Sequence, residues 1–241
     1  MKKQTIYNRF CRKKKQLAVL LDPDKSLDSF ALQKKVQLAE QIGIDYFFVG
    51  GSLISNSITN LINQIKKSSS IPVIIFPGSV IQISENADAL LFLSLISGRN
   101  PEFLIGSHVI AAPFLKKTQV EILSTGYILI ESGVQTSVEY MSNTKAIPHA
   151  KIDIATATAI AGEMLGNKLI YLEAGSGAAK PVSLEMIAEV KRNISVPLIV
   201  GGGIKTIQQI NNTFDAGADI VVIGTILEEN PELLKNYHAI Y

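Results

Sequence analysis

The sequence is poor in the residue types that stabilise disulfide-rich or metal-bound proteins. It contains a single cysteine, Cys11, so no disulfide can form within the chain. Its three histidines, His108, His149 and His238, lie far apart and lack the spacing of metal ligands, so we expect packing or surface roles for them. These shortages exclude a disulfide-stabilised scaffold and a histidine-based metal site, and they fit a reducing, cytoplasmic setting.

Long apolar runs and a strong net charge are also lacking. No run approaches the ~20 residues that cross a bilayer, and the N-terminal stretch is too charged for a signal peptide. The net charge is only +2, from 23 basic and 21 acidic residues, which excludes the strongly basic nucleic-acid binders. Basic residues do gather near the N-terminus, where we expect a solvated surface or, alternatively, a patch that contacts anionic lipid at a membrane surface. They are Lys2, Lys3, Arg9, Arg12, Lys13, Lys14 and Lys15.

What the sequence does have is a regular alternation of short apolar runs and helical patterns over residues 1–241, which predicts one domain. The apolar runs are typical of buried parallel strands. They lie at 17–21, 45–49, 73–76, 89–93, 127–130, 169–172, 198–200 and 220–223. The helical patterns lie at 27–42 with Ser26 as N-cap, 58–67, 101–112, 152–165, 183–192, 206–216 and 231–237. This alternation predicts an α/β protein with a TIM-type (βα)8 barrel, a fold of about 250 residues.

The third unit departs from this pattern. Only residues 77–87 separate the third and fourth predicted strands, close to the minimum of ~10–12 residues that a crossover with its helix needs. We expect a reduced or missing third helix, which is either a short connection without functional meaning or a gap in the outer helical ring. A gap would leave an apolar groove down the side of the barrel. Candidate residues for its lining are Phe76, Phe92, Leu93 and Phe103.

Glycine-rich turns follow the last three predicted strands. They are Gly175-Ser176-Gly177, Gly201-Gly202-Gly203 and Gly224-Thr225. Backbone N–H groups in such turns converge on phosphate, and a helix that begins behind the turn adds a favourable dipole. Barrels of this type commonly hold phosphate after strands seven and eight, so these turns predict a phosphate site.

Two acidic residues, Asp22 and Glu173, directly follow apolar strand residues and should point into the barrel mouth. A carboxylate there, with an oxygen from Ser52 at the next strand end, would suit Mg²⁺ bound to substrate phosphates. Glu173 could accept a proton from a substrate hydroxyl. The alternatives are a turn cap for Asp22 and an acceptor of backbone N–H groups for Glu173. The polar segment 132–151, with Tyr140, is expected to be a loop over the mouth or a contact between subunits.

Several of these motifs, in the same order and over nearly the whole chain, resemble those of the geranylgeranylglyceryl phosphate synthase family, which includes bacterial heptaprenylglyceryl phosphate synthases. They are Leu21-Asp22-Pro23-Asp24-Lys25, Gly50-Gly51-Ser52, Tyr171–Gly177, Gly201–Lys205 and Gly224-Thr225. The Tyr-Leu-Glu-Ala-Gly-Ser-Gly run is the most specific of them. The triple glycine and the Gly-Thr pair are shared with many phosphate-binding barrels.

The resemblance implies a prenyl transfer from a polyprenyl diphosphate to the primary hydroxyl of sn-glycerol 1-phosphate, with Glu173 positioning or deprotonating that hydroxyl. Mg²⁺ would be held by Asp22 and Ser52, and the missing helix would leave the groove for the prenyl tail. The implied substrate-binding residues are Tyr171, Leu172, Glu173, Ala174, Gly175, Ser176, Gly177, Gly202, Gly203, Gly224 and Thr225. The family also implies a homo-oligomer, either a dimer or a hexamer.

The chain departs from the family at Thr225, where Asn is common, which puts any side-chain contact at that position in doubt. Its length and the extended segment 132–151 are closer to the archaeal-type branch, which favours a geranylgeranyl donor. The glycine turns alone would also fit a phosphosugar isomerase or lyase on the same barrel. A non-catalytic phosphate-binding protein is a further alternative, and it would not depend on Glu173.

Overall fold

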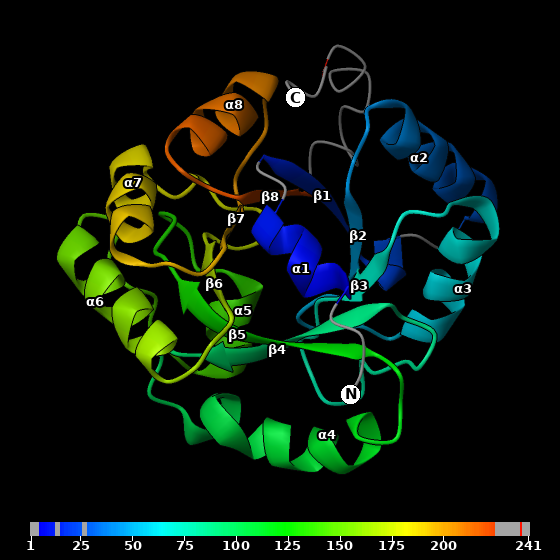
Figure 1. Ribbon diagram of the computed structural model, residues 1–241, viewed down its shortest axis with the longest axis horizontal. Coiled ribbons are helices and arrows are strands. Elements are labelled where there is room, and N and C mark those ends of the chain that lie inside the picture. The colour runs from blue at the N-terminus through cyan, green and yellow to red at the C-terminus, as the bar shows by residue number, and fades with distance from the viewer. Residues whose placement is uncertain (1–4, 13–14, 26–27, 225–236, 238–241) are drawn as a thin grey trace.

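Eight parallel strands form a closed barrel in the computed structural model, which describes residues 5–12, 15–25, 28–224 and 237 (Figure 1). Each strand pairs with the next along the chain, and the last pairs with the first. The strands are β1 Gln16–Leu21, β2 Tyr46–Val49, β3 Val73–Ile75, β4 Ala89–Leu95, β5 Glu121–Leu129, β6 Leu169–Glu173, β7 Leu198–Gly201 and β8 Ile220–Ile223. The predicted barrel is therefore confirmed.

Helices cover the outside of the strand ring (Figure 1). Asp28, Ser57, Ser183 and Thr206 cap four of them, each through its side-chain oxygen. The helices are α1 Thr5–Arg12, α2 Ser29–Gln41, α3 Ile58–Ser68, a π-helix Glu102–Gly106, α4 Ser107–Leu115, α5 Ser137–Ser142, α6 Ile152–Met164, α7 Leu184–Asn193 and α8 Ile207–Asp215, with a 3₁₀ turn at Pro23–Lys25.

Some of the predicted boundaries differ from the structure, and others cannot be compared with it. The N-cap of α2 is Asp28, whose carboxylate accepts the Phe30 N–H, and the expected cap Ser26 lies outside the described residues. Strand β5 begins six residues before Tyr127, because its residues from Glu121 onward pair along the whole of β4 although Ser124 and Thr125 interrupt its apolar pattern. The helix expected at 231–237 also lies outside the described residues, apart from position 237.

Alternating strand residues divide the core into two layers. Side chains such as Tyr46, Phe48 and Leu91 fill the barrel interior, whereas their neighbours along each strand pack outward against the helices. In β6 this alternation sends Tyr171 inward and Leu172 outward. The same alternation places Glu173 on the inner side at the carboxyl end of the strand.

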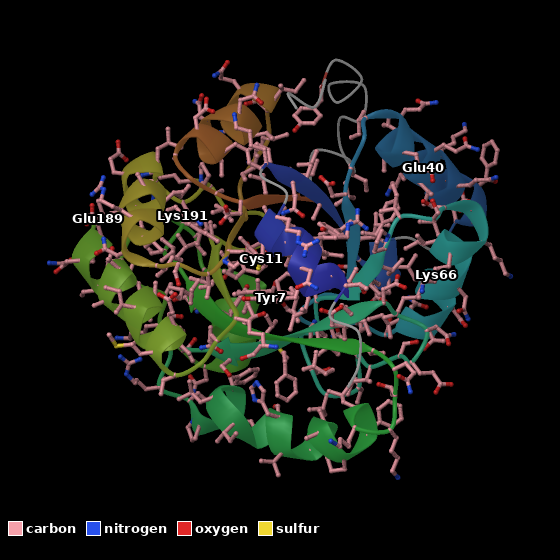
Figure 2. The ribbon with its side chains drawn as sticks, viewed as in Figure 1. Tyr7, Cys11, Glu40, Lys66, Glu189 and Lys191 are labelled. Atoms are coloured by element: carbon pink, nitrogen blue, oxygen red, sulfur yellow. The ribbon has the colours of Figure 1, made fainter. Side chains whose placement is uncertain are left out.

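Helix α1 closes the N-terminal end of the barrel, a feature that the sequence pattern did not predict. Ile6 and Phe10 are buried among the interior residues. The Glu121 carboxylate, at the start of β5, accepts hydrogen bonds from the Ile6 N–H at 2.8 Å and the Tyr7 N–H at 3.0 Å. Figure 2 shows Tyr7 and Cys11 on this helix, near the middle of the strand ring. The closed end of the barrel is thus opposite the strand ends that carry the predicted site.

No helix forms between β3 and β4, whose connecting residues 76–88 are all described and contain only turns and bends. The predicted gap is therefore confirmed, and Figure 1 shows the flanking helices α3 and α4 on either side of this connection. Among the helices of the described ranges, we find none that is both long enough and apolar enough to cross a membrane.

Candidate active site

A cavity of about 390 Å³ opens at the carboxyl ends of the strands and extends to the side of the barrel. Its upper part is lined by turns that follow β1, β2, β6, β7 and β8. Of the predicted site residues, those that line it are Asp22, Ser52, Tyr171, Glu173, Gly175, Ser176, Gly202, Gly203 and Gly224. The carboxyl ends of the strands are where barrels of this type place their ligands.

Four predicted binding residues are not among those that line the cavity. Leu172 and Ala174 point outward into the layer between strands and helices, as their places in the strand alternation require. Gly177 lies beyond the lining of the cavity. Thr225 lies outside the described residues, so its departure from the family pattern stays untested.

The side arm of the cavity is an apolar groove at the position of the missing helix. Val80 and Ile83 line it from the connection between β3 and β4, and Phe103, Ala111 and Leu115 line it from the π-helix and α4. The candidate lining residues Phe76, Phe92, Leu93 and Phe103 all belong to the cavity wall. An apolar surface that stays uncovered by any helix is suited to a long hydrocarbon ligand.

His108 lies on the same wall of the groove. Its ring packs edge-on against Phe92, with 4.4 Å between the ring centres. Its Nε2 lies 3.3 Å from the Ser94 hydroxyl, and burial lowers its pKa. The ring is thus packed into the groove wall, in keeping with the packing role expected for this histidine.

Glu173 is the buried acid of the site. Burial raises its pKa to about 7, although the hydrogen bond from the Gly175 N–H to Oε1, at 2.7 Å, opposes this shift. Both oxygens approach the turn after β7. A Cβ atom on Gly202 would lie 2.4 Å from Oε1, and one on Gly201 would lie 2.9 Å from Oε2. The carboxylate therefore sits directly beside the predicted phosphate turns.

An aromatic cluster lies beneath this carboxylate. Phe76 stacks on Tyr171 with 5.2 Å between ring centres, and Tyr127 meets Tyr171 edge-on at 5.3 Å. The Tyr171 hydroxyl is buried and lies close enough to the Glu173 carboxylate to oppose the rise in its pKa. It lies 2.6 Å from where a Gly201 Cβ would be, so it is directed at the turn after β7. A buried hydroxyl beside a carboxylate at the cavity wall is suited to bind a polar ligand atom.

Tyr127 was not predicted as a site residue. Its side chain lines the cavity, and burial raises the pKa of its hydroxyl well above the usual value. The sequence does place Tyr127 in a predicted strand, but at its first residue. With no preceding strand residues to compare, the inward or outward direction of its side chain could not be predicted from the alternation.

Asp22 and Ser52 lie on the other side of the mouth, at the ends of β1 and β2. The Asp22 carboxylate accepts the Asp24 N–H at 2.9 Å. Its Oδ2 lies 3.3 Å from where a Cβ of Gly51, the neighbour of Ser52, would be. The structure thus places one carboxylate beside the turn that carries one hydroxyl, and the described residues contain no cluster of three or more ionisable metal ligands. This donor set fits Mg²⁺, which takes one or two protein carboxylates and completes its shell with water and phosphate oxygens.

The segment 132–151 is only partly a loop, because it forms the short helix α5, and Ile130 bridges to Ile147. Ser137 and Val138 of α5 line the cavity, so the segment does lie over the mouth as expected. Tyr140 is not among the residues that line the cavity and is 73% exposed.

Comparison with known proteins assigns the chain to a family. The PcrB family model matches residues 9–240. The chain belongs to the PcrB family. It is 52% identical over 235 residues to the geranylgeranylglyceryl phosphate synthase of Flavobacterium johnsoniae, which covers 94% of this chain and 95% of the relative. It is 43% identical over 230 residues to the enzyme of the same name from Thermococcus kodakarensis, covering 95% of this chain and 90% of that one. The resemblance found in the sequence motifs is thereby confirmed.

Solved structures agree with this assignment. The geranylgeranylglyceryl phosphate synthase of Thermoplasma acidophilum, in complex with its substrate sn-glycerol-1-phosphate, superposes with a TM-score of 0.89 at 31% identity, over 98% of this chain and 97% of that one. The N-acetylmannosamine-6-phosphate 2-epimerase of Clostridium perfringens superposes over 93% of this chain and 92% of that one, with a TM-score of only 0.59 at 16% identity. The epimerase shares the fold alone.

Proposed function

We propose that this chain is a prenyltransferase that makes an ether between sn-glycerol 1-phosphate and a polyprenyl diphosphate, with geranylgeranyl diphosphate as the preferred donor. The bond from the prenyl carbon to the diphosphate oxygen breaks, and that carbon bonds to the primary hydroxyl oxygen of the acceptor. Diphosphate leaves, and the product is 3-O-geranylgeranyl-sn-glyceryl 1-phosphate. The observation that carries the proposal is one continuous cavity with glycine turns at one end and an apolar groove at the other.

The glycine turns after β6, β7 and β8 would hold the acceptor. Gly202, Gly203 and Gly224 would offer backbone N–H groups to its phosphate, and Tyr171 a hydroxyl to its glycerol part. The complex of the Thermoplasma acidophilum relative with sn-glycerol-1-phosphate supports this choice of acceptor.

Glu173 would take the proton of the attacking hydroxyl. A base works best when its pKa lies near the working pH, and burial raises the pKa of this carboxyl to about 7. Its oxygens lie beside Gly202, so an acceptor on that turn would bring its hydroxyl close to the carboxylate. General base catalysis of this kind contributes about 10²–10⁴-fold to the rate.

The donor would bind from the other side of the mouth. Asp22 and Ser52 would hold Mg²⁺ against the diphosphate, and the bound ion would stabilise the charge that develops on the leaving group. The groove walls at Val80, Ile83 and Ala111 would bury the prenyl tail, which contributes about 0.8 kcal/mol for each CH₂. A geranylgeranyl donor is favoured because relatives that align over nearly the whole chain carry that name.

A phosphosugar isomerase or lyase would use the same glycine turns, but it would have no use for the apolar groove or for the oxygens of Asp22 and Ser52. A non-catalytic phosphate-binding protein would have no need of a buried carboxyl with a raised pKa. Both alternatives leave the side arm of the cavity unexplained.

Two further parts of the proposal concern the surface. We infer a homo-oligomer, a dimer or a hexamer, with the exposed ring of Tyr140 as a contact. Contact with a membrane surface would be transient. The described basic residues Arg9, Arg12 and Lys15 are exposed near the closed end of the barrel, away from the cavity. We expect the protein to work in the cytoplasm.

The test is incubation of the protein with sn-glycerol 1-phosphate, Mg²⁺ and prenyl diphosphates of several lengths, with extraction and mass analysis of the ether product. Geranylgeranyl diphosphate should give the highest kcat/KM. Excess chelator should abolish turnover while calorimetry still detects binding of sn-glycerol 1-phosphate. Absence of an ether with every donor would overturn the proposal, and full turnover in chelator would overturn the role of Mg²⁺.

A further inference from the structure

Gln82 is a fully buried polar residue in the helix-free connection between β3 and β4, and its side chain is 1% exposed. Among the described residues, its side chain hydrogen-bonds to backbone groups alone. Its Oε1 accepts the Gly51 N–H at 3.3 Å and the Gly78 N–H at 3.1 Å, and its Nε2 donates to the Gly51 carbonyl at 2.7 Å. One side chain therefore joins the turn after β2 to the turn after β3.

The two turns also touch directly. A Cβ atom on Gly78 would lie 2.2 Å from the Gly51 carbonyl oxygen and 2.8 Å from the Ser52 Cα, so only glycine allows the backbones this close. The place of Ser52 is thus fixed against the connection that carries Gln82.

The far end of the same turn is held from the β1 side. The Asp24 carboxylate accepts the Ser55 N–H at 2.9 Å and the Asn56 N–H at 2.8 Å. Asp24 also donates its own N–H to Asp22. The stretch that carries Ser52 therefore lies between two anchors, with Asp24 on one side and Gln82 on the other.

The connection that carries Gln82 also forms a wall of the groove. Val80 and Ile83, which precede and follow Gln82 in the sequence, line the groove there. Gln82 is not among the residues that line the cavity. Both polar atoms of this buried side chain hydrogen-bond to the turns after β2 and β3. Such a side chain fixes the position of one turn relative to the other.

We propose that Gln82 is a positioning residue that holds the turn bearing Ser52 against the wall of the tail groove. It would thereby fix the distance between the diphosphate site and the groove, so that one donor molecule can occupy both. The inference rests on the proposed prenyl transfer. Residues of this kind, which orient groups around a metal, typically change affinity or activity by about 10–100-fold when they are replaced.

The decisive variant is Gln82→Met, which keeps the length of the side chain and removes its hydrogen bonds. We expect the KM for geranylgeranyl diphosphate to rise about 10–100-fold, with the KM for sn-glycerol 1-phosphate unchanged. Calorimetry with Mg²⁺ and inorganic diphosphate should show the same loss, because the turn itself is misplaced. The matched control is Ile83→Ala in the same connection, which should weaken the prenyl donor but leave inorganic diphosphate unaffected.

Gln82→Glu keeps an acceptor for the two N–H groups and loses the donor to Gly51, so it should fall between wild type and Gln82→Met. This variant decides the matter if Gln82→Met does not fold. Wild-type donor binding in both variants, or an equal loss of both substrates, would overturn the inference. If the wild-type protein itself makes no ether, the proposed function fails, and that result is distinct from these.

Discussion

Glu173 combines burial with a place beside the phosphate turn, which predicts how the rate depends on pH. Because burial raises the pKa of this carboxyl to about 7, a growing share is ionised as the pH rises through that value. We expect kcat/KM for sn-glycerol 1-phosphate to rise through about pH 7 and then level off. In Glu173→Gln this rise of kcat/KM with pH should disappear, and the rate should fall about 10²–10⁴-fold. A variant that retains the wild-type profile would show that another group is the base.

The same raised pKa has a consequence for stability. An ordinary Glu ionises near 4.5, so the unfolded chain gives up this proton more readily than the folded one. Protonated Glu173 therefore stabilises the folded state relative to the unfolded state. This contribution to the free energy of unfolding is complete below the unfolded pKa and is lost as the pH rises through about 7. Glu173→Gln should therefore gain stability relative to wild type between pH 6 and pH 8 in thermal melts. A constant difference over this range would contradict the burial argument.

Gly202 makes a prediction about the acceptor end. Its φ of +84° favours glycine, and a Cβ there would lie 2.4 Å from Glu173 Oε1 and 2.6 Å from the Gly175 nitrogen. Gly202→Ala should abolish measurable binding of sn-glycerol 1-phosphate by calorimetry. Gly177→Ala is the matched control, because Gly177 has a similar φ of +74° but nothing within 4 Å of the added Cβ. It should cost only the backbone strain of about 1–3 kcal/mol in stability. Equal binding loss in both would point to strain alone.

At the level of secondary-structure elements, the sequence predicted the strands and the missing helix, because both depend on local spacing. Eight apolar runs are visible in the sequence, and residues 77–87 are close to the minimum for a crossover with its helix. Helix α1 could not be predicted in this way. Only Ile6 and Phe10 of that helix are buried, and the Glu121 that caps it lies 115 residues away in the chain. The roles of Tyr127 and Gln82 likewise depend on contacts with other segments.

The groove beside α4 predicts how donor length can be changed. Ala111 faces the groove, whereas Val109 on the same helix is 64% exposed. Ala111→Phe should fill part of the groove and lower kcat/KM most for the longest donors, as measured with dimethylallyl, geranyl, farnesyl and geranylgeranyl diphosphates. Val109→Phe is the matched control and should leave the length preference unchanged. An equal effect of Ala111→Phe on every donor would place the tail elsewhere.

For the molecule as a whole, the barrel has a working end and a closed end, and the two should respond separately to mutation. Glu121→Ala removes the acceptor for two backbone N–H groups of α1 at the closed end. Leaving such buried groups unpaired costs about 1–3 kcal/mol, and each kcal/mol lowers the Tm of a domain this size by about 2–4 °C. Calorimetry should show this loss, while both KM values stay at wild type.

The control for this variant is Glu189→Ala. Glu189 pairs with Arg192 on the outer face of α7, where a surface ion pair contributes little (Figure 2). A rise in either KM on replacing Glu121 would show that the two ends of the barrel are coupled.

The gap between α3 and α4 also bears on how a lipid product gets out. In a closed tunnel a long tail would have to withdraw end first past the reacting groups. The apolar groove of this barrel is covered by no helix, so the tail can leave it sideways along its whole length. Transfer of the tail into water costs about 0.8 kcal/mol for each CH₂. The medium outside the groove therefore determines the rate of product release. For the longest products, turnover should then respond to detergent or lipid in the assay rather than to the opening of a lid.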